Sequence, residues 1–332
     1  MIVSYWIGSR RSYAWLIDGQ KTEMIVLPEG AARIRELVTE YREELEHSPR
    51  DPITNPASAG WKLAQAVAEP VAGKIPAGAN VIVVPDGPLH DISLDTLPLA
   101  GDPPQYWIER ATLAVAPSLH VMASVGPRSR TRGGVLIVGD PEPVAQYTKL
   151  SYASTEIGSL RRRFASREKK VLTGGEATVT AYRESDPERF WLIHFTAHAE
   201  ANHDAPLDSA VILAPDRSEY KLYAHDIDRL QAELVTVSAC RSAGSRSFSG
   251  EGLIGFAWAF LHAGARNVVA GLWDVDDRST AQLMDRMYAE LESGKSPAEA
   301  LHAAKLELLR SGGNLRKPYY WGPFQLYRTA ID

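Results

Sequence analysis

From Gly134 to the end of the chain, short apolar runs alternate with segments in which apolar residues recur at helical spacing. The apolar runs include GVLIVGD, KKVLTG, FWLIHFTA, SAVILAP, ELVTVSA and RNVVAGLW. Strands that are apolar throughout are buried on both faces, and a helix between two strands allows them to pair in parallel. The alternation therefore predicts an α/β fold with a mainly parallel central sheet flanked by helices. Ligands of such sheets bind beyond the carboxyl ends of the strands.

The first part of the chain has a different pattern. Its runs IVSYWIG, SYAWLID and EMIVLP are separated by short turns, which is typical of antiparallel hairpins. Helical spacing follows over residues 29–47 and 57–72, and a buried strand begins at Asn80. Residues 127–134 (PRSRTRGG) lack apolar periodicity, so we place a domain boundary there. The sequence thus predicts a smaller α/β domain over residues 1–130 and a larger one over residues 131–332.

Composition argues against several classes of protein. The 332 residues carry 36 Lys and Arg against 41 Asp and Glu, so nothing favours nucleic acid or a membrane surface as a partner. The single cysteine cannot form an internal disulfide, which suits a reducing compartment, and we expect a cytoplasmic protein. The sequence has no apolar run of about 18 residues and no phosphate-binding or dinucleotide-binding glycine motif after a strand. We expect no cofactor.

Two of the apolar runs lead into residues that can do chemistry. FWLIHFTA is followed by His198, and ELVTVSA is followed by Cys240. If the two strands are neighbours, the imidazole and the thiol meet at one edge of the sheet, where the imidazole can promote formation of the reactive thiolate. A lone cysteine after a buried strand can equally be an inert core residue, and spacing alone does not decide between these interpretations.

Two further histidines offer an alternative to a cysteine site. His194 lies in the same run, and His203 follows in a polar loop, so these two and His198 could together bind a metal ion. The zinc-protease pattern, however, needs a helix and a glutamate after its first histidine, whereas Phe195 stands there in a β-rich run. We therefore expect no metal site and predict that His194 is a core residue with a backbone partner.

A resemblance to the CHAT family of caspase-like cysteine peptidases rests on an ordered series of segments: FTAHAE, PLDSAVILAP, VTVSACRSAG, GEGLIGFAWAFLHAGARNVVAGLWDVDD, GKSPAEAL and YYWGPFQLY. Similar segments extend it back through VIVVPDGPLHDISLDTLPL. The resemblance implies a caspase-like sandwich preceded by a smaller, inactive caspase-like half. It implies a cysteine endopeptidase that needs no cofactor, acts on a protein or peptide substrate in bacterial defence or signalling, and has a tetratricopeptide-repeat or other sensor as partner.

The family's catalytic residues can be carried over by their settings. Its histidine stands in Ala-Thr-His-Gly and its cysteine in Ser-Ala-Cys, so the resemblance implies His198 and Cys240 as the dyad. Ala199 replaces the glycine whose backbone N–H would join that of Cys240 in the oxyanion hole. Alanine keeps this N–H and would impair catalysis only if the position required a positive φ. Because of this departure, a weak or inactive scaffold or regulatory module is the alternative.

The segment GLWDVDD also resembles the corresponding region of separases, relatives that cut after arginine. Asp274 and Asp277 are therefore candidate substrate-binding residues, since a carboxylate pairs well with a basic side chain at P1. The same aspartates, with Asp276, precede or begin a segment of helical spacing, DDRSTAQLMDRMYAELE. At least one of the three is expected to cap that helix.

Overall fold

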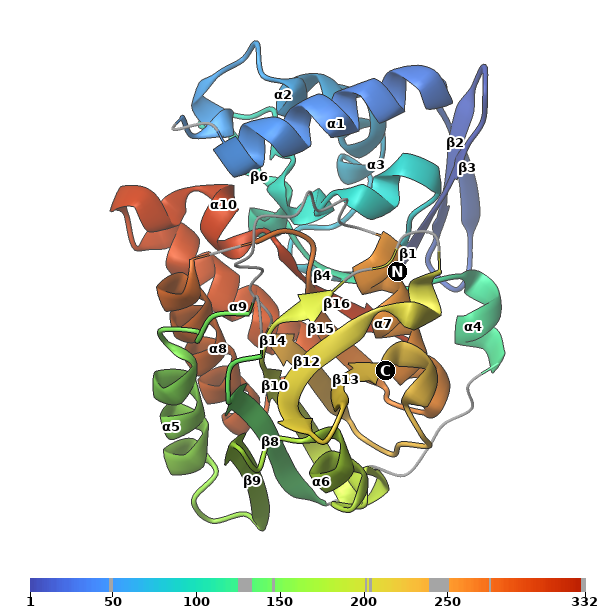
Figure 1. Ribbon diagram of the computed structural model, residues 1–332. Helices are drawn as coiled ribbons and strands as arrows, with labels where there is room; N and C mark the ends of the chain where they lie inside the picture. Colours follow the sequence, from blue (N-terminus) through green and yellow to red (C-terminus); the bar gives the residue numbers. More distant parts are fainter. Residues whose placement is uncertain are drawn as a thin grey trace.

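In the computed structural model, one sheet of eleven strands runs through the molecule and is flanked by helices (Figure 1). The strand order is β3-β2-β1-β4-β7-β16-β15-β14-β10-β8-β9. The structure describes residues 1–47, 50–124, 133–144, 147–200, 202, 205–238, 251–274 and 276–329. Most neighbouring strands in this sheet are parallel, which confirms the predicted fold class.

The N-terminal half of the sheet begins with an antiparallel edge, as the hairpin pattern predicts. Its strands are β1 (Ile2–Ile7), β2 (Ser12–Ile17), β3 (Thr22–Leu27), β4 (Ala79–Val84) and β7 (Ala111–Val115). Helices α1 (Ala31–His47), α2 (Ala59–Leu63) and α3 (Glu69–Ala72) cover one face, and α4 (Leu119–Ser124) lies below β1 in Figure 1. β1 turns the sheet from antiparallel to parallel, because it pairs with β2 on one side and with β4 on the other.

The C-terminal half contributes the remaining strands of the large sheet. These are β8 (Gly134–Pro141), β9 (Lys169–Gly174), β10 (Phe190–Thr196), β14 (Leu234–Ser238), β15 (Asn267–Gly271) and β16 (Phe324–Arg328). Its helices are α5 (Ala153–Arg163), α6 (Val179–Arg183), α7 (Glu251–Ala263), α8 (Asp277–Glu292), α9 (Pro297–Arg310) and α10 (Pro318–Trp321). None of the described helices is both long and apolar enough to cross a membrane.

Alternation along the strands creates two apolar layers. In β10, Leu192 packs into a core built with α5, α8 and α9, whereas Ile193 and Phe195 pack into a second core with α6 and α7. Successive side chains of a strand point to opposite faces, so a strand buried on both sides must be apolar at nearly every position. This explains why these strands read as continuous apolar runs in the sequence.

One apolar run departs from the parallel pattern. SAVILAP forms most of β12 (Ala210–Asp216), which lies in a separate three-stranded antiparallel sheet between β11 (Ala199–Glu200) and β13 (Glu219–Tyr223). Apolar content alone does not reveal which sheet a strand joins. The small sheet adjoins the candidate residue His198, because β11 starts directly after it.

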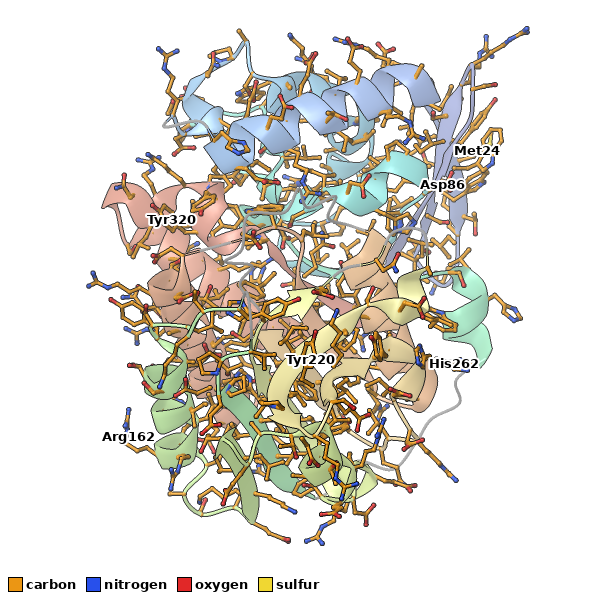
Figure 2. All side chains as sticks on the ribbon, in the orientation of Figure 1. Met24, Asp86, Arg162, Tyr220, His262 and Tyr320 are labelled. Atoms are coloured by element: carbon orange, nitrogen blue, oxygen red, sulfur yellow. The ribbon has the colours of Figure 1, made fainter. Side chains whose placement is uncertain are left out.

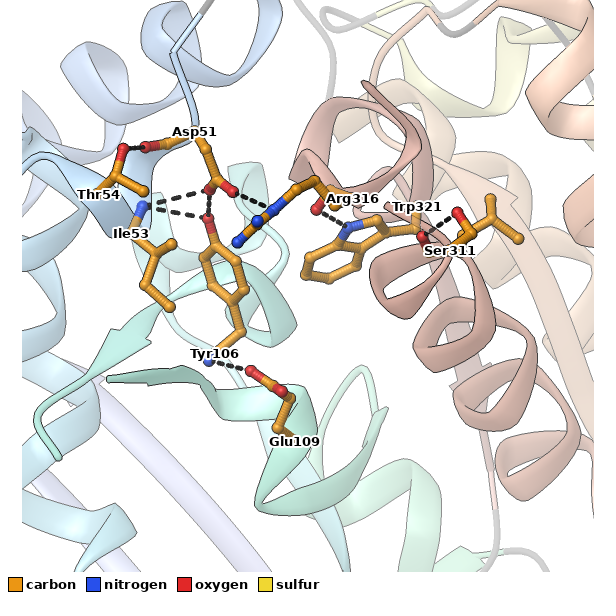
Figure 3. A network of polar contacts seen from close by, with 9 residues as sticks. Asp51, Ile53, Thr54, Tyr106, Glu109, Ser311, Arg316 and Trp321 are labelled. Atoms are coloured by element: carbon orange, nitrogen blue, oxygen red, sulfur yellow. Dashed lines mark hydrogen bonds and ion pairs between the residues drawn. The ribbon is translucent and has the colours of Figure 1, made fainter. Parts of the chain in front are cut away.

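The two halves are joined by the sheet itself and by buried polar contacts. β16 pairs with β15 on one side and with β7 on the other. Lys305 of α9 is buried and bonds to Asp95 of the N-terminal half. Figure 3 shows a second link, where Asp51 accepts a hydrogen bond from the Tyr106 hydroxyl and from Arg316 Nε at 3.0 Å.

The domain boundary predicted near residue 130 stays a prediction, and residues 125–132 lie outside the described residues.

Candidate active site

The strands that lead to His198 and Cys240 are direct neighbours. β10 and β14 pair in parallel from Leu192 and Leu234 onwards, and Thr196, the last residue of β10, lies opposite Ser238, the last residue of β14. His198 follows Thr196 by two residues, and Cys240 follows Ser238 by two residues. The two strands are thus neighbours, which is the condition that the sequence pattern left open. Cys240 itself lies outside the described residues, as do all residues from 239 to 250.

His198 is buried and oriented by a backbone carbonyl. The residue is only 6% exposed, and its Nε2 lies 2.6 Å from the carbonyl oxygen of Thr148. A carbonyl oxygen can only accept, so Nε2–H is the donor, and in the neutral ring Nδ1 then carries the basic lone pair. The Tyr147 ring packs beside the imidazole, with centroids 5.7 Å apart. Sequence reasoning missed Thr148, because a backbone acceptor leaves no signature in residue type.

The chain around Thr148 forms a short loop before α5, here called the rim segment (residues 147–152). Three contacts attach it to different parts of the sheet edge: Thr148 to His198, Ser151 N–H to Asp277 Oδ2 at 3.0 Å, and Lys149 Nζ to Asp140 Oδ2 at 3.4 Å. Asp140 belongs to β8 and Asp277 begins α8. The rim segment thus connects the end of β8, the end of β10 and the start of α8.

The three aspartates after β15 have different roles. Asp276 is the N-cap of α8, since its Oδ1 accepts the Ser279 N–H at 3.0 Å, which confirms the expected helix cap. Asp277 is half-buried and holds the rim segment through Ser151. Asp274 is half-buried and follows β15, which pairs in parallel with β14. Asp274 and Asp277 therefore follow a strand that ends at the same edge of the sheet as β10, and substrate binding by either stays a prediction.

Ala199 occupies ordinary extended backbone. It is the first residue of β11 and lies opposite Val211 of β12. Among the described residues, the non-glycine positions with positive φ are Asp140, Asp186 and Arg217, so alanine causes no backbone strain at position 199. The Ile212 N–H donates to the His198 carbonyl at 2.8 Å. Because bonded and non-bonded pairs alternate in an antiparallel ladder, the Ala199 N–H points away from β12.

Gly139 allows the close approach of β8 to the end of β10. It lies opposite Thr196, and a Cβ at this position would lie 2.6 Å from the Thr196 carbonyl oxygen. No real Cβ atom comes so close to backbone, so any other residue would displace one of the two strands. The glycine in VLIVGD is therefore explained by packing at the edge where His198 emerges.

His194 is fully buried, as predicted, but its partners are side chains rather than backbone. Nδ1 lies 2.7 Å from the Tyr288 hydroxyl, while Nε2 lies 2.8 Å from Glu156 Oε1 and 2.7 Å from Thr196 Oγ1. Tyr288 is 94 residues away in the sequence, so local pattern could not identify it. His203, the third histidine of the metal alternative, lies outside the described residues.

Comparison with known proteins places this geometry in context. The model of the CHAT domain family matches residues 58–329. Tetratricopeptide repeat protein 28 of Mus musculus is 30% identical over 103 residues, which are 31% of this chain and 4% of that protein. The chain therefore spans only a small part of this curated relative.

Two solved structures match this chain at low sequence identity. The crystal structure of the Arg specific cysteine proteinase gingipain R (RGPB) has a TM-score of 0.50 at 10% identity, over 89% of this chain and 74% of that chain. A separase–securin complex of Saccharomyces cerevisiae has a TM-score of 0.49 at 12% identity, over 76% of this chain and 16% of that chain.

Proposed function

The chain belongs to the CHAT domain family, and on that premise we propose that it is a cysteine endopeptidase with Cys240 as nucleophile and His198 as general base and acid. The observation that carries the proposal is the position of His198. Thr148 holds its ring through Nε2, at the end of a strand that pairs in register with the strand preceding Cys240. Two residues of chain extend at most about 7 Å, so this register supports a close approach of thiol and imidazole.

The chemistry follows from the tautomer that Thr148 selects. Nδ1 of His198 takes the proton of the Cys240 thiol, and the sulfur forms a bond to the carbonyl carbon of the substrate. Nδ1–H then gives its proton to the leaving amine as the C–N bond breaks, leaving a thioester on Cys240. Water, deprotonated by Nδ1, hydrolyses the thioester and restores the thiol. Throughout, the Thr148 carbonyl keeps Nε2–H bonded and the ring in one orientation.

Backbone N–H groups of Ala199 and Cys240 form the oxyanion hole in this proposal. The unstrained, extended backbone of Ala199 and the direction of its N–H, away from β12, support a role as donor. The replacement of glycine by alanine thus gives no specific support to an inactive scaffold.

A basic residue at P1 is the finer part of the proposal, with Asp274 or Asp277 as its partner. Oδ2 of Asp277 already accepts the Ser151 N–H, but a carboxylate has acceptor sites on both oxygens and can bind a guanidinium as well. Its attachment to the rim segment, which also contacts His198, supports its presence near the scissile bond.

A tetratricopeptide-repeat or other sensor protein is the proposed partner. The support is the curated mouse relative, which is named for such repeats and extends far beyond the matched 4% of its length. A partner that acts as activator would raise peptide turnover when added to the purified chain.

Cleavage of a fluorogenic peptide panel tests the function. Peptides with Arg, Lys, Asp, Leu or Ala at P1 are compared for the wild type, Cys240→Ala and Asp277→Asn, with Asp276→Asn as the matched control at the neighbouring helix cap. We expect turnover of the Arg and Lys peptides, its loss in Cys240→Ala, and a weaker basic preference in Asp277→Asn alone. Turnover that survives in Cys240→Ala would contradict the proposal.

A further inference from the structure

Five buried polar side chains form a network beneath the ends of β10 and β14. His194 contacts Tyr288, Glu156 and Thr196 at 2.7, 2.8 and 2.7 Å, and the Tyr288 hydroxyl lies 2.8 Å from Thr236 Oγ1. Each of the five residues is at most 3% exposed. They come from α5, β10, β14 and α8, so the network joins two adjacent strands to two helices on one face of the sheet.

The directions of these hydrogen bonds follow from the groups involved. A carboxylate can only accept, so Nε2–H of His194 donates towards Glu156, and the Thr196 hydroxyl donates to the same carboxylate at 3.4 Å. Burial raises the pKa of the Tyr288 hydroxyl, so it keeps its single proton. That one proton serves either Thr236 Oγ1 or His194 Nδ1, and the hydroxyl oxygen accepts from the other partner when that partner carries a proton. A buried carboxylate without hydrogen-bond partners is strongly unfavourable. The contacts with His194 and Thr196 therefore stabilise Glu156 in its observed position.

The network is continuous with the proposed site. Thr196 ends β10 two residues before His198, and Thr236 of β14 lies in register with His194. Glu156 lies in the first turn of α5, which begins directly after the rim segment that supplies the Thr148 carbonyl. A movement of α5 along β10 would therefore change the distance between Thr148 and His198.

We propose that Glu156 and His194 are positioning residues, which anchor α5 and the rim segment to β10 and thereby keep the His198 ring on the Thr148 carbonyl. This inference rests on the proposed peptidase function for its catalytic consequence. Its structural part, the anchoring of the His198 ring, can be measured without any turnover.

The test uses the full chain with ¹⁵N-labelled histidine. Long-range ¹H–¹⁵N spectra report which nitrogen of each ring carries the proton, and His198→Gln identifies the His198 signal. We expect a stable Nε2–H signal for His198 in the wild type. In Glu156→Ala, the Nε2–H signal of His198 should disappear and the ring should exchange between its two tautomers. Glu156→Gln, which keeps an acceptor oxygen, should retain most of the signal.

Catalysis gives a second readout. Glu156→Ala should lower kcat by about 10- to 100-fold with little change in KM, because misplacing His198 affects the chemical step rather than substrate binding. Thr196→Val, which replaces only the hydroxyl by a methyl group, should have the same effects as Glu156→Ala but smaller ones: a weaker Nε2–H signal for His198 and a lower kcat. This smaller change keeps the inference testable if Glu156→Ala does not fold.

Asn267→Ala is the matched control for stability. Asn267 is buried at the amino end of β15, the neighbour of β14, and its Nδ2–H donates to the carbonyl of Glu233, which precedes β14, at 3.0 Å. This variant should lower the unfolding temperature without changing the His198 signal or kcat.

A His198 signal that persists in both Glu156→Ala and Thr196→Val, or disappears equally in Asn267→Ala, would overturn the inference. Absence of the Nε2–H signal from the wild type would overturn it as well. A wild type that cleaves no peptide would contradict the proposed function, and the tautomer signal would then decide the inference alone.

Discussion

The two halves of the sheet share one architecture but differ in what their strands bury. β4 and β7 pair in parallel in the N-terminal half, as β10 and β14 do in the C-terminal half. After Asn80 and Thr112 near their amino ends, β4 and β7 contain only apolar residues. β10 and β14 instead bury a histidine, two threonines and a serine among their apolar residues.

The residues that follow the strands show the same contrast. Asp86 comes shortly after β4 (Figure 2), and its carboxylate accepts the Ile7 N–H at 2.6 Å, a contact that closes a loop onto β1. His198 comes shortly after β10 and presents a titratable ring. Buried polar groups cost free energy unless they are satisfied, so a sheet that only packs can omit them. Their concentration in β10 and β14 distinguishes the C-terminal half, in which we propose the catalytic site.

The largest difference between the halves is expected in catalysis. His198→Gln keeps a donor for the Thr148 carbonyl but cannot shuttle a proton, so kcat for peptide cleavage should fall by about 10²–10⁴-fold with little change in stability. Asp86→Asn should do the reverse, lowering the free energy of unfolding by about 1–2 kcal/mol with kcat unchanged. Steady-state kinetics and urea unfolding check both, and equal loss of activity in the two variants would break the comparison.

The contact between the halves should dominate stability. Asp95→Ala leaves Lys305, which is only 1% exposed, without its carboxylate, and we expect a loss of about 3–5 kcal/mol in the free energy of unfolding. Replacing both residues in the Asp95→Leu, Lys305→Met double variant should cost much less. Chemical denaturation measures these values, and a single-variant loss below that of the double variant would refute the assignment.

How much the sequence reveals can be judged from particular elements. The strands of the C-terminal half and α1 were predictable because the spacing of apolar residues along the sequence distinguishes buried strands from amphipathic helices. The membership of β12 was not, since its apolar run says nothing about its partners. At the site, the positions of His198 and Cys240 after two apolar strands followed from the pattern, and Asp276 was among the expected caps. That these two strands pair with each other came only from the structure. The Thr148 carbonyl and the partners of His194 depend on tertiary packing.

Ala199 should have a small effect. Because its backbone is extended and unstrained, Ala199→Gly should cost roughly 0.5–1 kcal/mol in stability through added freedom of the unfolded chain, with peptide turnover nearly unchanged. Thermal unfolding and turnover of the best peptide check this. A large gain in turnover would mean that the position needs glycine after all.

The smallest effect is expected at the amino edge of the sheet. Ser296, through its hydroxyl and its N–H, holds the pKa of Glu299 below its ordinary value, with a smaller contribution from Asn80. This contribution to stability is present above the unfolded-state pKa of about 4.3 and is lost as pH falls through the lower folded-state value. In Glu299→Gln, the free energy of unfolding should therefore fall less steeply as the pH is lowered below about 4.3, and peptide turnover should be unchanged. An unaltered pH dependence of stability would show that the reciprocal contacts between Ser296 and Glu299, which cap α9, have no energetic role.

The most direct test of the central claim is the rate at which iodoacetamide alkylates Cys240 at neutral pH, compared with a model thiol. A thiol activated by His198 should react faster than the model thiol, and His198→Gln should remove this advantage. A Cys240 that reacts slowly in the wild type, with the same rate in His198→Gln, would contradict the account.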